Sequence, residues 1–234
     1  MDALAYRMMA ATQDHHWWWE GRRQILRRTL TALRAGGLLP PGVLYDLGCG
    51  CGSNLGVLGE FGDAVGLDGS ARAVEYARAS GRSNVRLVDL TDAEAVQTAC
   101  PAGSGAVVLL ADVLEHLDAE GPALEIAGRV LAPNGCLLIT VPALPMLWGP
   151  ADDFNHHRRR YSRATLVRAV ETRFTVERMS YFNTFLLPPI AVARWLGRVL
   201  RRPGHEELAL PPAPVNATLR RVLSFESRLL EQLQ

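Results

Sequence analysis

A glycine loop and a set of acidic residues are the parts of this chain whose types and spacing could do chemistry. The loop reads Asp46-Leu47-Gly48-Cys49-Gly50-Cys51-Gly52, and an apolar run from Val43 leads into it. Glycine has no Cβ, so such a loop lets the backbone turn sharply and a ligand approach closely. A glycine loop between a strand and a helix is typical of a nucleotide site in a doubly wound sheet. The G-x-G-x-G spacing differs from the G-x-G-x-x-G fingerprint, and Asp46 would sit where a diphosphate approaches. Both features argue against NAD.

Further acids stand at the ends of the apolar segments that follow. Asp68 ends the segment 64–68, Asp89 ends 84–89, and Asp112 comes directly after 105–111. The carboxyl ends of parallel strands meet at one edge of a sheet, where open α/β folds bind ligands. A single acid at a strand end is often only a helix cap. Three at consecutive strand ends, together with the loop, favour a binding site.

The segment from Asp46 to Gly52, with the order of the later segments, resembles the class I S-adenosylmethionine-dependent methyltransferases over roughly residues 43–183. The resemblance implies S-adenosyl-L-methionine as cofactor, with the glycine loop against its amino-acid and sulfonium part. Asp46 would then accept from the ammonium directly or through water, Asp68 from both ribose hydroxyls and Asp89 from the adenine amino group. The expected cofactor contacts are Asp46, Gly48, Gly50, Gly52, Asp68, Gly69, Asp89, Leu90, Asp112, Val113, Trp19 and Arg23.

Alternating apolar and helical segments predict the fold. Strands are expected in the apolar run that begins at Val43 and at 64–68, 84–89, 105–111, 136–141 and 174–182, with helices between them and a turn at 133–135. This order predicts right-handed parallel βαβ units in an α/β, doubly wound, mostly parallel sheet, the Rossmann-like class I methyltransferase fold. The family usually adds a seventh strand, which we do not find, because 186–201 and 215–233 look helical. The predicted division is an N-terminal helical lid (1–36), a cofactor-binding domain (37–184) and a helical C-terminal extension (185–234).

Composition narrows the class of protein. The chain has 234 residues, 48% of them hydrophobic, which suits one α/β domain with an added cap. The net charge of +1 does not demand nucleic acid, and no window reaches the ~18 apolar residues of a membrane span. No secretory signal is recognisable at the start. The four cysteines follow neither a disulfide nor a zinc spacing, so we expect a cytoplasmic protein without a metal.

The segment Asp112–Leu117 resembles the part of the family that lines the methyl-acceptor side. His116 is a candidate general base, or else a histidine that packs at a helix start. The run Trp17-Trp18-Trp19 begins a second unusual segment. Three adjacent tryptophans cannot face one core from one helix, so an aromatic lid over the cofactor is one interpretation. Aromatic faces attract cations such as a sulfonium. An ordinary apolar staple of the N-terminal helix is the other.

The connection 148–161 is long and carries acids, imidazoles, guanidinium groups and a phenol. Long ordered loops are often functional, which favours an acceptor pocket over a solvated basic loop or a docking surface for Glu20. The candidate polar contacts are Asn155, His156, Tyr161 and Tyr181. The run 158–160 is all arginine and could equally bind an anionic substrate. The apolar segment 185–200 is compatible with a membrane surface, although a core or dimer helix is commoner.

Three functions remain open at this point. The first is methyl transfer to a small molecule by in-line displacement, in secondary metabolism, where positioning does most of the work. The second resembles the azetidine-2-carboxylate synthases, in which the cofactor's amino group attacks its own γ-carbon and expels methylthioadenosine. Asn155 and Tyr181 would then orient the amine. The third is a non-catalytic cofactor-binding subunit. The expected partners are a small-molecule substrate or the cofactor alone, with a homodimer left open.

Overall fold

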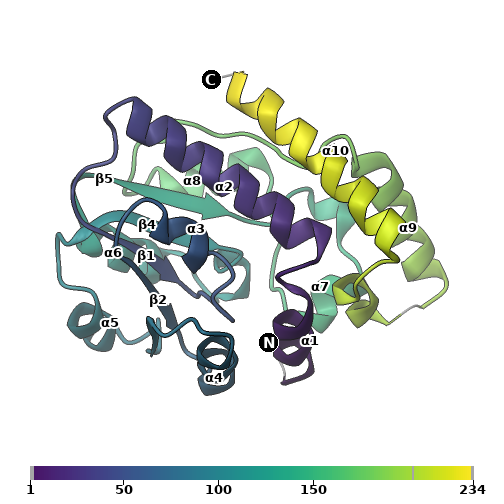
Figure 1. Cartoon of the computed structure of the whole chain (residues 1–234), viewed down its shortest axis with the longest axis horizontal. Coiled ribbons are helices and arrows are strands. Elements are labelled where there is room, and N and C mark those ends of the chain that lie inside the picture. Colours follow the sequence, from purple (N-terminus) through teal and green to yellow (C-terminus); the bar gives the residue numbers. More distant parts are fainter. Residues whose placement is uncertain (1–2, 202, 233–234) are drawn as a thin grey trace.

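The computed structural model describes residues 3–201 and 203–232 and contains a five-stranded sheet. The strands are β1 (Val43–Leu47), β2 (Ala64–Asp68), β3 (Val85–Leu87), β4 (Gly105–Ala111) and β5 (Leu131–Thr140). Their order is β3-β2-β1-β4-β5, and every neighbouring pair is parallel (Figure 1). The chain order reverses between β1 and β4. This confirms the predicted doubly wound sheet and places its ligand-binding switch point at the carboxyl end of β1.

Side chains alternate between the two faces of each strand, so the sheet builds two cores. Tyr45 and Leu47 pack on one face, and Leu44 packs on the other. The first face is covered by α5 (Ala93–Ala99), α6 (Gly121–Val130) and α8 (Arg163–Val170), and the second by α2 (Trp17–Ala35), α3 (Leu55–Gly59) and α4 (Ala71–Ala79). Coverage of both faces explains why β4 is almost wholly apolar.

The remaining helices gather at the carboxyl edge of the sheet. They are α1 (Ala3–Thr12), η1 (Leu114–His116), η2 (Pro145–Leu147), α7 (Pro150–Phe154), α9 (Leu187–Val199), η3 (Gly204–Leu208) and α10 (Ala213–Gln232). Figure 1 shows α10 running alongside α2. Ser70 and Ser162 cap the starts of α4 and α8, because their hydroxyls accept from the Ala73 and Thr165 amides. The C-terminal helices predicted at 186–201 and 215–233 correspond to α9 and α10, and residue 233 lies outside the described residues.

The predicted strand at 174–182 is wrong. These residues have no regular secondary structure and pair with no strand among the described residues. Their alternation of apolar and polar residues reflects packing against neighbouring helices and not hydrogen bonding in a β-sheet. The Phe174 ring lies against Gly128 of α6, Arg178 donates to the Leu230 carbonyl of α10, and Phe182 stacks on Trp18. Alternation shows that one side of a segment is covered, and it does not show what covers it.

The predicted turn at 133–135 lies inside β5 as a bulge. Gly105 pairs with Leu131 and Val107 pairs with Cys136, so four residues of β5 face one residue of β4 and the start of the strand bulges. Asn134 adopts the left-handed conformation (φ 62°) there. The predicted strand 136–141 is therefore the regular part of β5. The predicted strand 84–89 is shortened to three residues at the edge of the sheet.

Gly21 sets the distance between α2 and α10. A Cβ at this position would lie 2.2 Å from Leu223 Cδ2 and 2.7 Å from its Cγ, and the Leu223 side chain is fully buried. We expect Gly21→Leu to lower the free energy of unfolding by about 3 kcal/mol. Chemical denaturation measures the effect. Gly56→Leu on α3 is the matched control, since nothing lies within 4 Å of the Gly56 Cβ position. Equal stability of the two variants would contradict the packing described here.

No described helix combines the length and the apolar character that crossing a bilayer requires. The helix α9 nevertheless exposes Trp195, Val199 and Leu200. Its basic residue Arg194 points inward instead, donating to the Leu147 carbonyl at 2.9 Å and to Asp152 at 3.0 Å.

Candidate cofactor and acceptor site

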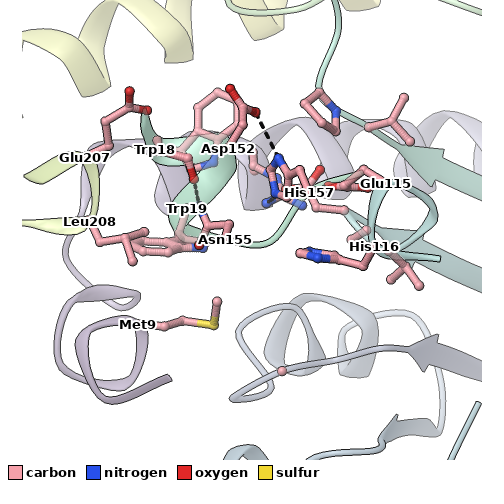
Figure 2. Close-up of a pocket in the computed structure, with 18 of the residues that line it drawn as sticks. Met9, Trp18, Trp19, Glu115, His116, Asp152, Asn155, His157, Glu207 and Leu208 are labelled. Atoms are coloured by element: carbon pink, nitrogen blue, oxygen red, sulfur yellow. Dashed lines mark hydrogen bonds and ion pairs between the residues drawn. The ribbon is translucent and has the colours of Figure 1, made fainter. Parts of the chain in front are cut away.

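A cavity of about 1140 Å³ opens at the carboxyl edge of the sheet. Its walls come from the glycine loop, the ends of β2 and β4, the helices α1 and α2, and the segments 141–160 and 180–197. Figure 2 shows how side chains from the two halves of the chain meet around it. The doubly wound sheet therefore places its cavity where the sequence predicted a ligand.

The glycine loop forms one wall through backbone that only glycine adopts readily. Gly48, Gly50 and Gly52 have φ values of 79°, 55° and 77°. A Cβ on Gly48 would lie 2.6 Å from Val113 Cγ2, and one on Gly50 would lie 3.3 Å from Met9 Sδ of α1. Gly48 and Gly50 line the cavity, whereas Gly52 lies outside its lining. The loop thus presents bare backbone to a ligand, as its sequence indicated.

Asp68 lies at the centre of this wall. Its Oδ2 accepts from the Gly50 amide and its Oδ1 accepts from the Ser70 amide, each at 2.8 Å. The side chain is 7% exposed, and burial raises the pKa of its carboxyl. Each carboxylate oxygen has a second acceptor site. Asp68 can therefore hold the loop in shape and still accept two hydroxyl groups from the cavity.

Asp46 occupies a different position from the one expected of it. It is fully buried behind the loop and does not line the cavity. The Asn54 amide donates to its Oδ2 at 3.2 Å, and its Oδ1 has no hydrogen-bond partner among the described residues. Burial raises the pKa of Asp46 to about 7. Direct contact with a ligand ammonium is therefore excluded in this conformation, and any contact has to pass through Asn54 or water.

The expected adenine contacts line the far end of the same wall. They are Gly69, Asp89 and Leu90. Asp89 is solvent-exposed, and its Oδ1 accepts from the Thr91 amide at 2.9 Å and from the Thr91 hydroxyl at 2.7 Å. These hydrogen bonds lower the pKa of Asp89. The carboxylate is therefore charged near neutral pH, and its contact with an adenine amino group stays a prediction.

Asp112 and Val113 both line the cavity, and Asp112 is already paired. Its Oδ2 accepts from Arg22 at 2.6 Å, and the same guanidinium donates to the Thr140 hydroxyl at 3.2 Å. Arg22 also lies 5.7 Å from the ring centroid of Trp18. The pair joins the N-terminal helix to the end of β4. The sequence contains no signal for this partner, because 90 residues separate the two.

The N-terminal helices cover the cavity. His16, Trp17, Trp18 and Trp19 all line it, with Trp18 stacked on Phe182 at 5.7 Å between ring centroids. His16 caps α2, and burial lowers its pKa to about 4. Trp19 is buried at 7% exposure. The three tryptophans thus form an aromatic wall of the cavity, and α2 additionally packs Leu30 into the sheet core. Their role as a lid over the cofactor stays a prediction.

Arg23, an expected cofactor contact, lies outside the cavity lining. Its guanidinium donates to the Gln13 carbonyl at 2.8 Å and to the Asp14 carbonyl at 3.4 Å. The Gln13 side chain, which is fully buried, reaches the Cys51 carbonyl of the glycine loop at 3.3 Å. Arg23 therefore holds the junction of α1 and α2 and acts on the loop only through Gln13.

The four polar contacts expected for an acceptor separate into two groups. Asn155 and Tyr181 line the cavity. His156 is exposed and opens onto a smaller surface cleft. Tyr161 is buried at 3% exposure, and its hydroxyl donates to Glu120 at 2.9 Å. Burial raises the pKa of the Tyr161 phenol. Of the four, only Asn155 and Tyr181 can therefore contact a molecule in the cavity in this conformation.

The three arginines of the run 158–160 form ion pairs with acidic residues of the same chain. Arg158 pairs with Asp118, Arg159 with Glu120 at 2.7 Å, and Arg160 with Asp152 at 2.9 Å. Glu20, expected as a docking partner of this loop, pairs instead with Arg220 of α10. These ion pairs hold the loop on the domain, and they disfavour its use as a site for an anionic substrate.

Glu115, Asp152 and His157 were not singled out from the sequence, yet they meet beside His116. Asp152 is 1% exposed and accepts from His157, Arg160, Arg194 and the Gly149 amide. Its pKa is lowered to about 2: burial raises it, but the hydrogen bond from His157 and the two guanidinium groups outweigh that effect. Burial lowers the pKa of His116 to about 4 and raises that of Glu115 well above its ordinary range. His116 is therefore neutral near pH 7.

The residues at the loop fit the cofactor that the resemblance implies. The glycine cradle would be filled by a Cβ, Asp68 keeps free acceptor sites, and an aromatic wall faces the region where a sulfonium would lie. The set of hydrogen-bonding and aromatic groups matches a ribose, an amino group and a cation.

Comparison with known proteins supports the same cofactor. Residues 45–139 match the family model described as a methyltransferase domain. No curated protein matches the chain significantly. Among solved structures, an S-adenosylmethionine-dependent methyltransferase from Mesorhizobium loti shares 20% identity at a TM-score of 0.53, over 77% of this chain and 93% of that one.

Two further solved structures share the fold. A candidate sarcosine dimethylglycine methyltransferase from Galdieria sulphuraria is 18% identical at a TM-score of 0.53, covering 87% of this chain and 79% of that one. A complex of the Haloferax volcanii Trm112 methyltransferase activator with a candidate methyltransferase gives 23% identity and a TM-score of 0.54, with 78% of each chain covered. These structures share the Rossmann-like fold of the class I S-adenosylmethionine-dependent methyltransferases, and the domain match over residues 45–139 together with the geometry of the loop supports S-adenosyl-L-methionine as the cofactor.

Proposed function

We propose that this protein transfers a methyl group to a small-molecule acceptor that binds in the cavity beside the cofactor. The supporting observation is the size and polarity of the cavity. Its volume of about 1140 Å³ exceeds what one cofactor needs, since pockets for single drug-sized ligands run to ~300–1000 Å³. The cofactor contacts take one end of it. The other end is lined by Asn155, Tyr181 and His116, which can orient an acceptor.

Positioning is the main contribution that these residues would make. S-adenosylmethionine, when bound, supplies a methyl group activated by its sulfonium. The loop and Asp68 hold the nucleoside, while Trp17–Trp19 cover the cavity and exclude water. Correct alignment of reacting groups is worth several kcal/mol of the barrier. His116 is neutral and offers a hydrogen bond to the acceptor, and its lowered pKa makes it a weak base.

Cyclisation of the cofactor to azetidine-2-carboxylate is the second candidate. The observation that favours it is the aromatic wall, because Tyr6, Trp17, Trp18 and Trp19 all line the cavity. Burial raises the pKa of Tyr6 to about 12, so its phenol stays neutral. Such a wall could exclude external acceptors and hold the sulfonium. In that case Asn155 and Tyr181 would orient the cofactor's amine.

We also propose a reducing cytoplasmic location, with which the buried free thiols are compatible.

Product analysis separates the candidate functions. The purified chain is incubated with S-adenosylmethionine alone and with a panel of small amines, alcohols, thiols and acids. Acceptor-dependent S-adenosylhomocysteine supports methyl transfer. Methylthioadenosine formed from the cofactor alone would support cyclisation and overturn the leading proposal. Absence of both products, with S-adenosylhomocysteine still binding, would favour the non-catalytic subunit. Asn155→Ala should reduce turnover at least tenfold, whereas His156→Ala, outside the cavity, should not.

A further inference from the structure

Three side chains with metal-ligating atoms meet in the wall of the cavity, between β4 and α7. Glu115, His116 and His157 each offer one ligand atom, and these atoms all lie within 4.8 Å of one another. Figure 2 shows the three side chains converging from two different segments. Glu115 and His116 belong to η1, and His157 follows α7. All three line the cavity.

Glu115 supplies the independent observation that points to a ligand. Its side chain is fully buried, and neither carboxylate oxygen has a hydrogen-bond partner among the described residues. The facing His157 Nε2 lies 3.9 Å from Glu115 Oε1, which is too long for a hydrogen bond. An unsatisfied buried carboxyl is costly, and native proteins pair such groups or use them to bind metals.

His157 is held in the orientation of a metal ligand. Its Nδ1 is hydrogen-bonded to Asp152 Oδ1 at 2.9 Å, so its Nε2 is directed toward Glu115. Asp152 itself is fixed by Arg160 at 2.9 Å and by Arg194 at 3.0 Å. Metal-ligating histidines almost always have their second ring nitrogen bound to a carboxylate or carbonyl in this way, which fixes the tautomer and the ring.

We propose that Glu115, His116 and His157 bind one divalent first-row transition-metal ion whose remaining coordination positions face the cavity. Two imidazoles and one carboxylate favour ions such as Zn²⁺, Fe²⁺ or Co²⁺ over Mg²⁺, which prefers oxygen ligands. Ligand bonds of about 2.1 Å require donor atoms about 3.0–3.4 Å apart. The side chains would therefore move together by roughly 1 Å on binding, which small torsional changes can supply.

The ion would also define the acceptor class, an inference that rests on the proposed methyltransferase function. Open positions on a metal in the cavity wall would bind an acceptor through an oxygen or nitrogen lone pair. A hydroxyl, carboxylate or amine beside the cofactor would then be selected over a purely apolar molecule. The metal site itself does not depend on methyl transfer.

Cobalt titration of the full-length protein tests the site. After treatment with EDTA and its removal, Co²⁺ is added and its visible d–d absorption is recorded, with Zn²⁺ and Mg²⁺ as competitors. We expect one equivalent of Co²⁺, displaced by Zn²⁺ and not by Mg²⁺. Glu115→Gln and His157→Gln should each weaken Co²⁺ binding at least about 100-fold. His156→Gln is the matched control on the same loop and should bind Co²⁺ like the wild type.

Three results would overturn the site. The first is absence of Co²⁺ absorption in the folded wild type. The second is binding unchanged in both Glu115→Gln and His157→Gln, which would place the ion elsewhere. The third is intense near-ultraviolet absorption from thiolate ligands, which would assign it to the cysteines. S-adenosylhomocysteine binding is measured on the same samples. If the protein binds S-adenosylhomocysteine but not Co²⁺, the metal site alone is rejected. If it binds Co²⁺ but not S-adenosylhomocysteine, the proposed function alone is rejected.

Discussion

Replacement of Asp68 by alanine is expected to raise the Kd for S-adenosylhomocysteine at least about 100-fold. Asp68 accepts from the Gly50 and Ser70 amides and lines the cavity, with acceptor sites left for two hydroxyls. Hydrogen bonds to a charged group contribute about 1.5–3 kcal/mol each, and alanine also releases the loop from its anchor. Isothermal titration calorimetry measures the change.

Asp63→Ala is the matched control for this prediction. Asp63 is an exposed residue just before β2, at the end of the strand opposite to Asp68. It should leave the affinity unchanged. Asp68→Asn, which keeps the shape and one acceptor oxygen, should fall between the two. A folded Asp68→Ala variant that binds S-adenosylhomocysteine like the wild type would refute the assignment of this carboxylate.

The second large effect is expected at Asp152, and it concerns stability. Asp152→Ala should lower the free energy of unfolding by about 3–5 kcal/mol, and Tm by about 10 °C. The carboxylate is 1% exposed and meets His157, Arg160 and Arg194. Alanine would leave Arg160, with 7% of its side chain exposed, without its buried counter-charge. Arg194 keeps its ion pair with Glu207 at 2.7 Å and its hydrogen bond to the Leu147 carbonyl.

The control and the pH dependence make this prediction specific. Asp153→Ala removes an exposed neighbour whose carboxylate accepts from the Trp148 indole, and should cost about 1 kcal/mol. The folded pKa of Asp152 is about 2, below its ordinary 3.8. Its stabilisation is therefore present above pH 4 and is lost as the pH falls toward 2. The stability gap between wild type and Asp152→Ala should narrow over that range. A constant gap would contradict a charged Asp152.

The cofactor half of the site could be predicted because its signals are local. Each strand is a short apolar run that ends in an acid, and the parallel order brings those ends to one edge. Asp68, Asp89, Gly48 and Gly50 follow from this rule, and all four line the cavity. Asp46 obeys the same pattern and is nevertheless buried behind the loop. The pattern predicts that a residue lies at the carboxyl end of a strand, but it does not predict whether the side chain faces the cavity or the core behind the loop.

The acceptor half could not be predicted in the same way, because it is built from contacts distant in sequence. His157 meets Glu115 and Asp152, and Arg22 meets Asp112 across 90 residues. In the loop 148–161, the sequence shows which residues are polar, but not which of them form hydrogen bonds within the protein and which face the cavity. Tyr161 is turned inward onto Glu120, while Asn155 faces the cavity.

Calorimetric titration of the wild-type chain with S-adenosylhomocysteine tests the central claim most directly, that the edge of the sheet at β1 and β2 binds a sulfonium nucleoside. We predict one molecule bound per chain with a Kd below about 100 µM, equivalent to about −5.5 kcal/mol. Folded protein that gives no binding heat at millimolar S-adenosylhomocysteine, over several temperatures, would contradict the account.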